Sequence, residues 1–205
     1  PLVSTALRNP AAGDFLVVVY LLALGTFFLA LAGIDTGGAF GGFGSSREML
    51  VAALAEGGLI LSLLTPALLA RSTDLFAVAA HIASLPFSDL PPVILAFVGF
   101  FVALLAETGR YPFDNPATHL ELTMIHEAMI LEYSGKRLAL IEWSSANKYL
   151  IFIALGANLF FPWGLAGSFA IGEIALSLAL VAGKTLLLCA AVALLESTIA
   201  KFRIF

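Results

Sequence analysis

The chain has 205 residues, of which 60% are hydrophobic and only 12% charged, and its formal net charge is −4. Its mean hydropathy of +1.02 is typical of a polytopic membrane protein, because a soluble domain of this size needs a far more polar surface. The sequence has no basic patch with interleaved aromatic residues, so nothing in it indicates a nucleic-acid partner. The single cysteine, Cys189, excludes a disulfide within the chain and an iron–sulfur cluster held by this chain alone.

Five apolar segments are long enough to cross, or nearly cross, a bilayer, which takes about 20 residues. We therefore predict an all-α integral membrane protein in which residues 1–205 form a single transmembrane domain. The predicted spans cover residues 15–34, 49–70, 92–106, 138–163 and 169–195. Residues 75–82 are also apolar but too few to span, which indicates an interfacial or re-entrant helix.

Two connections stand out. The first is rich in glycine, so it is expected to be flexible or to approach another backbone closely; its glycines are Gly37, Gly38, Gly41, Gly42 and Gly44. The second, residues 107–137, is a charged loop. Within it, residues 118–132 are expected to form a helix capped by Asp114 or Asn115, with Pro116 in its first turn.

The basic residues that flank the spans predict the orientation. One side carries Arg47, Arg110, Lys136, Arg137, Lys201 and Arg203, and the other carries Arg8 and Arg71. Because cytoplasmic loops carry the excess of Lys and Arg, the charged loop 107–137 is expected in the cytoplasm of a cell whose inner membrane holds the protein.

Several ionisable residues fall inside or beside the apolar spans. Glu56 lies seven residues inside the second span, Glu142 begins the polar start of the fourth, and Lys184 falls near the middle of the fifth. Such groups are costly in lipid and usually serve an ion path or pair with a partner, so both interpretations remain open for Glu56 and Lys184. Arg110 is spaced to pair with either Glu107 or Asp114.

Histidines in the loop do not form a metal site. His119 and His126 are seven residues apart, whereas zinc ligands on a helix need a spacing of four or a cysteine pair. Each is expected to be a hydrogen-bonded interface residue or, because a histidine pKa lies near neutrality, a proton relay. There is also no phosphate-binding loop and no nucleophile–base pair, so no stand-alone catalytic residues are predicted.

Two motifs resemble a known family. AETGRYPFDNPATHLEL at residues 106–122, with LEYSG at residues 131–135, resembles the quinone-pocket subunit of respiratory complex I, as does GSSR at residues 44–47 followed by Glu56. The loop is more similar to the sister subunit of membrane-bound nickel–iron hydrogenases, the formate hydrogenlyase subunit 4 family. In complex I this loop is shorter and lacks the insert that carries the histidines.

The resemblance covers about residues 13–205 and implies a membrane anchor that couples a hydrophilic hydrogenase arm to ion translocation. The implied partners are the hydrogenase large and small subunits, iron–sulfur subunits and antiporter-like membrane subunits; the nickel–iron centre and the iron–sulfur clusters are expected in these partners, with no cofactor in this chain. Residues implied to line the conduit are Arg47, Glu56, Glu107, Arg110, Asp114, Glu121 and Glu132, to which the spans add Glu142 and Lys184. The expected contacts with the arm are His119, His126, Glu127, Lys136 and Arg137.

A quinone-pocket subunit of a complex I-like NADH or ferredoxin oxidoreductase is the alternative, and a purely structural anchor is the third. The family usually has about eight helices, so the sequence is expected to be a fragment of a longer subunit. The electron donor, and the choice between proton and sodium, do not follow from the sequence.

Overall fold

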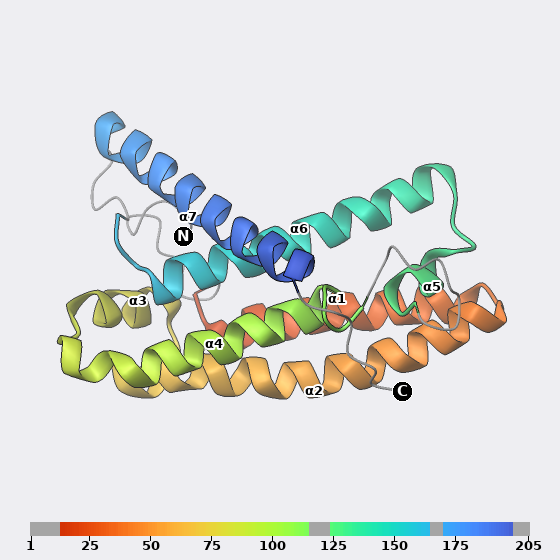
Figure 1. Ribbon diagram of the computed structural model, residues 1–205, viewed down its shortest axis with the longest axis horizontal. Coiled ribbons are helices and arrows are strands. Elements are labelled where there is room, and N and C mark those ends of the chain that lie inside the picture. The colour runs from red at the N-terminus through yellow and green to blue at the C-terminus, as the bar shows by residue number, and fades with distance from the viewer. Residues whose placement is uncertain (1–12, 115–123, 165–169, 199–205) are drawn as a thin grey trace.

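The computed structural model describes residues 13–114, 124–164 and 170–198. These residues form α-helices, one 3-10 turn and an isolated β-bridge. In chain order, as labelled in Figure 1, the elements are α1 (Phe15–Asp35), α2 (Ala39–Ala70), α3 (Leu75–Ser84), η1 (Phe87–Asp89), α4 (Leu90–Glu107), α5 (His126–Ile130), α6 (Gly135–Phe160) and α7 (Ile171–Thr198). The predicted all-α class is confirmed.

Five stretches in the described ranges are long and apolar enough to cross a membrane, and they match the five predicted spans. They are α1, α2, η1 with α4, α6 and α7. The short apolar stretch after the second span is helix α3, as expected. The protein is therefore an integral membrane protein.

Helix α2 begins at Ala39, ten residues before the predicted start of the second span. The prediction of a loop here was wrong because glycine lowers local hydropathy and helix propensity, while tertiary packing favours helix. A Cβ added to Gly44 would lie 2.9 Å from the backbone oxygen of Ile125, and one added to Gly41 would collide with the backbone oxygen of Gly33. The expected close approach of two backbones is thus real, but it occurs within a helix.

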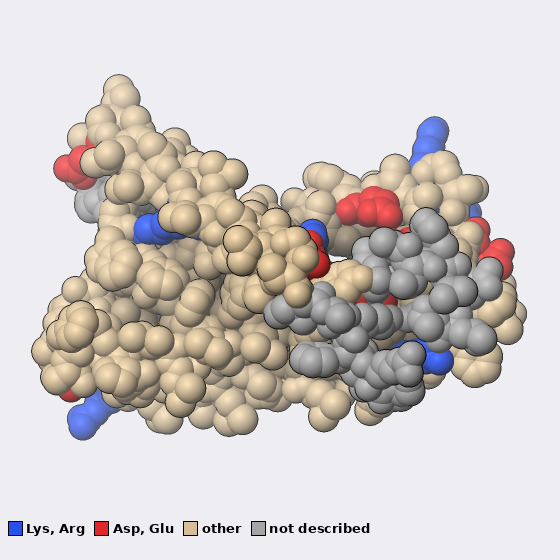
Figure 2. All heavy atoms as spheres, viewed as in Figure 1, with Lys and Arg blue, Asp and Glu red and all other residues tan. Residues whose placement is uncertain are grey.

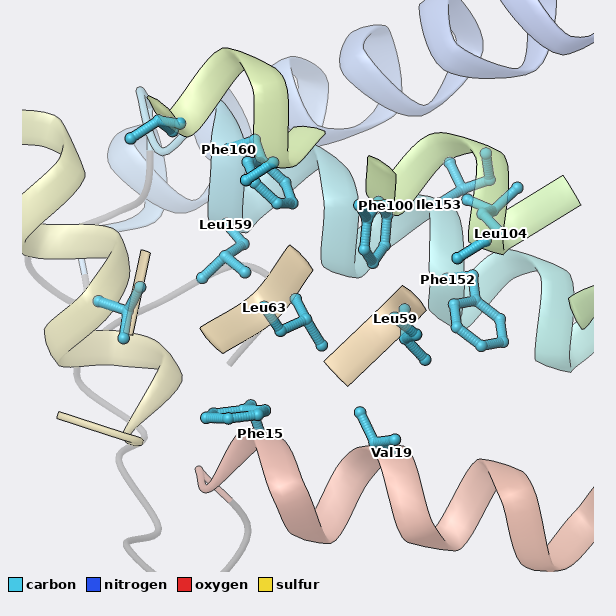
Figure 3. Close-up of a cluster of buried hydrophobic side chains, with 14 of the residues drawn as sticks. Phe15, Val19, Leu59, Leu63, Phe100, Leu104, Phe152, Ile153, Leu159 and Phe160 are labelled. Carbon is cyan, nitrogen blue, oxygen red and sulfur yellow. The ribbon is translucent and has the colours of Figure 1, made fainter. Parts of the chain in front are cut away.

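The long helices form one bundle. Figure 1 shows α1, α2 and α4 side by side, with α6 crossing over them and α7 leaning away at its N-terminal end. The core between these helices is apolar (Figure 3): Phe15 and Val19 of α1 meet Leu59 and Leu63 of α2, and Phe100 of α4 stacks near Phe160 of α6. Burial of this surface contributes about 25 cal/mol per Å² and fixes the helices against one another.

The helices alternate in direction. Helix α1 ends beside the start of α2, whereas α4 and α7 end beside the middle of α6, where Glu107 meets Lys148 and Glu196 meets Arg110 next to Tyr149. Helix α5 packs on α1 and α2 at this same end of the bundle, which we call the α5 end. Most of the face in Figure 2 carries no charge, and the charged side chains gather at the ends and in the hollow beside α7. The fold therefore brings the described part of the charged loop, the middle of α6 and the end of α7 together.

Candidate functional site

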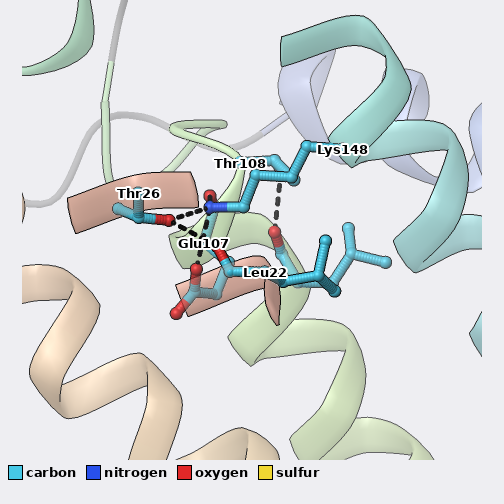
Figure 4. A network of polar contacts seen from close by, with 6 residues as sticks. Leu22, Thr26, Glu107, Thr108 and Lys148 are labelled. Carbon is cyan, nitrogen blue, oxygen red and sulfur yellow. Dashed lines mark hydrogen bonds and ion pairs between the residues drawn. The ribbon is translucent and has the colours of Figure 1, made fainter. Parts of the chain in front are cut away.

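A buried ion pair lies at the centre of the α5 end. The Lys148 ammonium of α6 lies 2.9 Å from Oε2 of Glu107, the last residue of α4. It also donates to the Glu107 backbone oxygen at 2.7 Å and to Oγ1 of Thr26, on α1, at 2.7 Å. Figure 4 shows the lysine reaching across from α6 into this cage of acceptors. Only 6% of Glu107 is exposed, so the pair is formed away from solvent.

A second carboxylate, Glu48 of α2, is buried beside this pair and is 5% exposed. Lys148, Glu107 and Asp114 are the charged groups that act on it electrostatically. Among the described residues, no hydrogen bond or ion pair holds the Glu48 carboxylate. A buried charge without a partner costs several kcal/mol. Of the buried acids in the site, Glu48 is therefore the one whose negative charge is least compensated by the protein.

Asp114 organises the start of α5. Its Oδ2 accepts hydrogen bonds from the backbone N–H groups of Ile125 at 3.1 Å and His126 at 2.9 Å. We expected Asp114 or Asn115 to cap a helix over residues 118–132; in the structure Asp114 binds the backbone N–H groups at the start of α5, which begins at His126 and ends at Ile130. Capping by a carboxylate satisfies two backbone donors and complements the helix dipole.

His126, the first residue of α5, places its imidazole against α6. Its Nε2 lies 3.4 Å from Oγ of Ser145. Burial lowers the pKa of His126, and the cation of Lys148 lowers it further, whereas Asp114 and Glu142 act in the opposite direction. At neutral pH the ring is therefore uncharged, with one nitrogen that donates and one that accepts.

Arg110 makes a different ion pair from the one expected. Its guanidinium lies 3.3 Å from Glu196 of α7 and stacks 4.4 Å from the centre of the Tyr149 ring. Glu107 and Asp114 were the predicted partners, but Glu107 is engaged by Lys148 and Asp114 by the backbone of α5. Local spacing favoured the near carboxylates, whereas the fold brings Glu196 from 86 residues away.

Three adjacent cavities lie beside these groups. The outer cavity, about 400 Å³, is lined by Arg110, Glu142 and Glu196; the central cavity, about 550 Å³, by Glu48, Glu107 and Lys148; and the side cavity, about 310 Å³, by Glu56. The outer and central cavities share Thr108, His126 and Ser145 as lining residues. The central and side cavities share Thr26 and Glu107. Polar groups thus follow one another from the α5 end to Glu56.

The other residues predicted to line the ion path lie around these three cavities. Glu56 is half-buried midway along α2, deeper than its predicted place because the helix starts earlier. Arg47 is half-buried on the same helix, whereas Glu132 is exposed in the turn after α5. Lys184 lines none of the three cavities; its ammonium donates to the backbone oxygens of Phe161 and Trp163, at the end of α6.

The predicted contacts with a hydrophilic arm are partly visible. Lys136 and Arg137 are exposed in the first turn of α6, and Glu127 lines the outer cavity beside Glu142. The predictions for His119 and Glu121 lie outside the described residues. The helix predicted over residues 118–132 is described from Met124 onward, where only His126–Ile130 is helical.

Sequence reasoning missed the two residues at the centre of the site. Glu48 directly follows Arg47 and was assigned to a loop, so its burial was not foreseen. Lys148 was recognised only as part of a polar start to the fourth span. Lys148 could have been identified from its spacing of three residues from Ser145 and four from Ser144, because this spacing places the three polar residues on one face of a helix.

Comparison with known proteins agrees with this picture. Residues 2–205 match the family described as NADH dehydrogenase. The chain is 31% identical over its whole length to formate hydrogenlyase subunit 4 of Escherichia coli K12, of which it covers 66%, and 36% identical over 99% of its length to hydrogenase-4 component C of the same organism, of which it covers 63%. It is also 34% identical over 69% of its length to an NADH-quinone oxidoreductase subunit of Syntrophotalea carbinolica, of which it covers 42%. The chain thus spans less than two thirds of the length of each of these relatives.

Proposed function

Because the chain belongs to the NADH dehydrogenase family, we propose that it is the membrane-anchoring and energy-coupling subunit of a membrane-bound nickel–iron hydrogenase. The relatives named for formate hydrogenlyase and hydrogenase-4 align with nearly all of it, which supports the hydrogenase assignment. In this proposal the hydrophilic arm holds the nickel–iron centre and the iron–sulfur clusters, and antiporter-like subunits adjoin the chain within the membrane.

One observation carries the coupling role: three adjoining cavities are lined by ionisable groups at successive positions. Charged side chains inside an apolar bundle are expensive unless they serve a path, a pair or a switch. Here the path consists of Glu142 in the outer cavity, Glu48 and Glu107 in the central cavity, and Glu56 in the side cavity. We assign Lys184 to the packing of α7 on α6, since its contacts are backbone oxygens.

The test compares acid-to-amide variants in the complete complex in sealed membranes. Glu48→Gln and Glu56→Gln keep side-chain shape and remove the charge, so we expect the complex to assemble and form hydrogen while the coupled ion gradient is lost. Glu173→Gln, at the exposed start of α7, is the matched control and should keep the gradient. A normal gradient in both path variants would favour a purely structural anchor.

Similarity to a subunit of NADH-quinone oxidoreductase supports a second candidate, a quinone-pocket subunit. The two candidates differ in the electron acceptor. Hydrogen evolution without quinone dependence, together with lipid extracts that contain no bound quinone, is expected for the hydrogenase subunit. Quinone-dependent turnover of the purified complex would support the alternative instead.

We further propose that the α5 end faces the cytoplasm and contacts the hydrophilic arm. Arg47, Arg110, Lys136 and Arg137 all lie toward this end, as the positive-inside rule expects. In a Cys189→Ser background, Lys136→Cys should react with an impermeant thiol reagent only from the cytoplasmic side. Arg71→Cys, exposed at the opposite end, should react only from the other side. The reverse pattern would overturn the orientation.

A further inference from the structure

His126 occupies the junction between the outer and the central cavity of the site. It lines both the outer cavity, about 400 Å³, and the central cavity, about 550 Å³. Its backbone is fixed by the 2.9 Å hydrogen bond to Asp114, and Ser145 lies 3.4 Å from its Nε2. The ring is therefore held at the boundary by groups on both sides of α5.

Among the described residues that line both cavities, His126 alone carries an imidazole, which can both accept and release a proton. The others are Thr108 and Ser145. The Thr108 hydroxyl donates to the backbone oxygen of Leu104 at 2.7 Å, so its proton is engaged within α4. An imidazole, in contrast, can accept a proton on one nitrogen and release one from the other.

We propose that His126 is a proton-relay residue that passes protons between the outer and the central cavity. A hydronium ion in the outer cavity gives a proton to the free ring nitrogen, which forms a new N–H bond, and a water molecule is left behind. The N–H bond on the other nitrogen then breaks, and its proton passes through water to the carboxylate of Glu48 or Glu107, which forms an O–H bond. No electron is transferred; the ring returns to its neutral form as the other tautomer, and a ring flip restores the starting arrangement before the next proton is taken up. This inference rests on the proposed coupling function and names the transported ion as a proton.

The charged surroundings fit a relay that carries protons one at a time. Burial and Lys148 hold the pKa of His126 below its ordinary value, so the charged ring is short-lived at neutral pH. Asp114 and Glu142, which line the outer cavity, act in the opposite direction and favour protonation of the ring. The charged and titratable groups that face His126 are Asp114 after α4, Glu142 and Lys148 of α6, Glu48 of α2, Glu107 of α4, and, across the outer cavity, Arg110, Tyr149 and Glu196.

The experiment uses the complete complex reconstituted in sealed vesicles with a pH-sensitive dye. His126→Gln should lower coupled proton translocation about tenfold or more, since a positioned proton-transfer group contributes about 10²–10⁴ to a rate. Hydrogen formation in the presence of an uncoupler should stay within twofold of the wild type. His81→Gln, on α3 at the opposite end of the bundle, is the matched control and should translocate normally.

Chemical rescue separates a relay from a packing role. In His126→Ala the side chain is removed, and added imidazole should restore part of the translocation, whereas a lost packing contact is not restored by a diffusing base. His126→Asn provides a second polar variant if the glutamine variant fails to assemble. Normal translocation in an assembled variant, or loss of translocation without imidazole rescue, would overturn the proposal.

Glu48→Gln distinguishes the failure of this inference from the failure of the coupling function. If Glu48→Gln abolishes translocation and His126→Gln does not, the path stands and the relay is wrong. If both variants translocate normally, the coupling function itself is wrong. A sodium gradient that forms without proton movement would also overturn the relay, because an imidazole transfers protons and not sodium ions.

Discussion

Replacing Lys148 by methionine tests whether the buried ion pair holds the site together. Methionine has nearly the length of lysine but no charge. In the native chain, the ammonium lies 2.9 Å from the Glu107 carboxylate and 2.7 Å from both the Glu107 backbone oxygen and Thr26 Oγ1. The variant leaves the Glu107 side chain, 4% exposed, without its counter-charge.

The expected loss of stability depends on which partner of the Lys148–Glu107 pair remains buried after the substitution. Removing one partner of a buried ion pair destabilises by about 3–5 kcal/mol, because an uncompensated charge remains. Glu107→Gln should cost less, about 1.5–3 kcal/mol, since the ammonium keeps the backbone oxygen and Thr26 and gains an amide oxygen. The double variant should lose less stability than the two single variants lose together, and the difference, the coupling free energy, should be about 0.5–3 kcal/mol.

Denaturant unfolding of the complete subunit in mixed micelles, followed by the fluorescence of Trp143 and Trp163, measures these differences. Lys136→Met is the control, because Lys136 is exposed in the first turn of α6 and its loss should cost no more than about 1 kcal/mol. If Lys148→Met costs no more than this control, or if the two single costs add fully in the double variant, the pair does not stabilise the fold as argued.

Three further outcomes are expected. Arg110→Met should lower the free energy of unfolding by no more than about 1 kcal/mol, because its ion pair is 40% exposed on the arginine side, and a larger loss in the same denaturant assay would contradict this. Gly156→Ala should destabilise by about 1–3 kcal/mol in that assay, because the new Cβ lies 2.7 Å from the buried Phe100 ring, whereas Gly183→Ala, with nothing within 4 Å, should not. Since burial lowers the pKa of folded His126, the unfolded state binds more protons in acid; the contribution of His126, measured as the stability difference between the wild type and His126→Gln at each pH, should fall below about 6.5 and hold steady above it.

The five spans followed from the sequence because hydropathy is a local property. Each lipid-facing helix needs about 20 apolar residues whatever its neighbours are. The charged loop was also visible as a local cluster, and Glu107 and Asp114 within it prove to be buried. Their partners were not visible, because Lys148 lies 41 residues from Glu107, and nothing in either segment specifies the other.

The start of α2 was missed for a related reason. Glycines at 41 and 44 indicate either freedom or close contact, and only the neighbouring helix decides between them. Here α1 and α5 take the space that side chains would fill. The same contact brings His126 of α5 over the part of α2 that carries Glu48, so the misplaced boundary concealed the burial of Glu48.

The charges of the site do not balance, and this imbalance suits the proposed proton path. Within the described part of the chain, the buried acids of the cluster are Glu48, Glu107 and Asp114, and the base beside them is Lys148. Asp114 is satisfied by two backbone N–H groups, and Glu107 by the ammonium. Glu48 faces a cavity in place of a fixed partner, in a setting where an unpaired charge costs several kcal/mol. In the proposed path, a proton that arrives through the cavity supplies the missing positive charge and can leave again, which a permanent lysine partner would prevent.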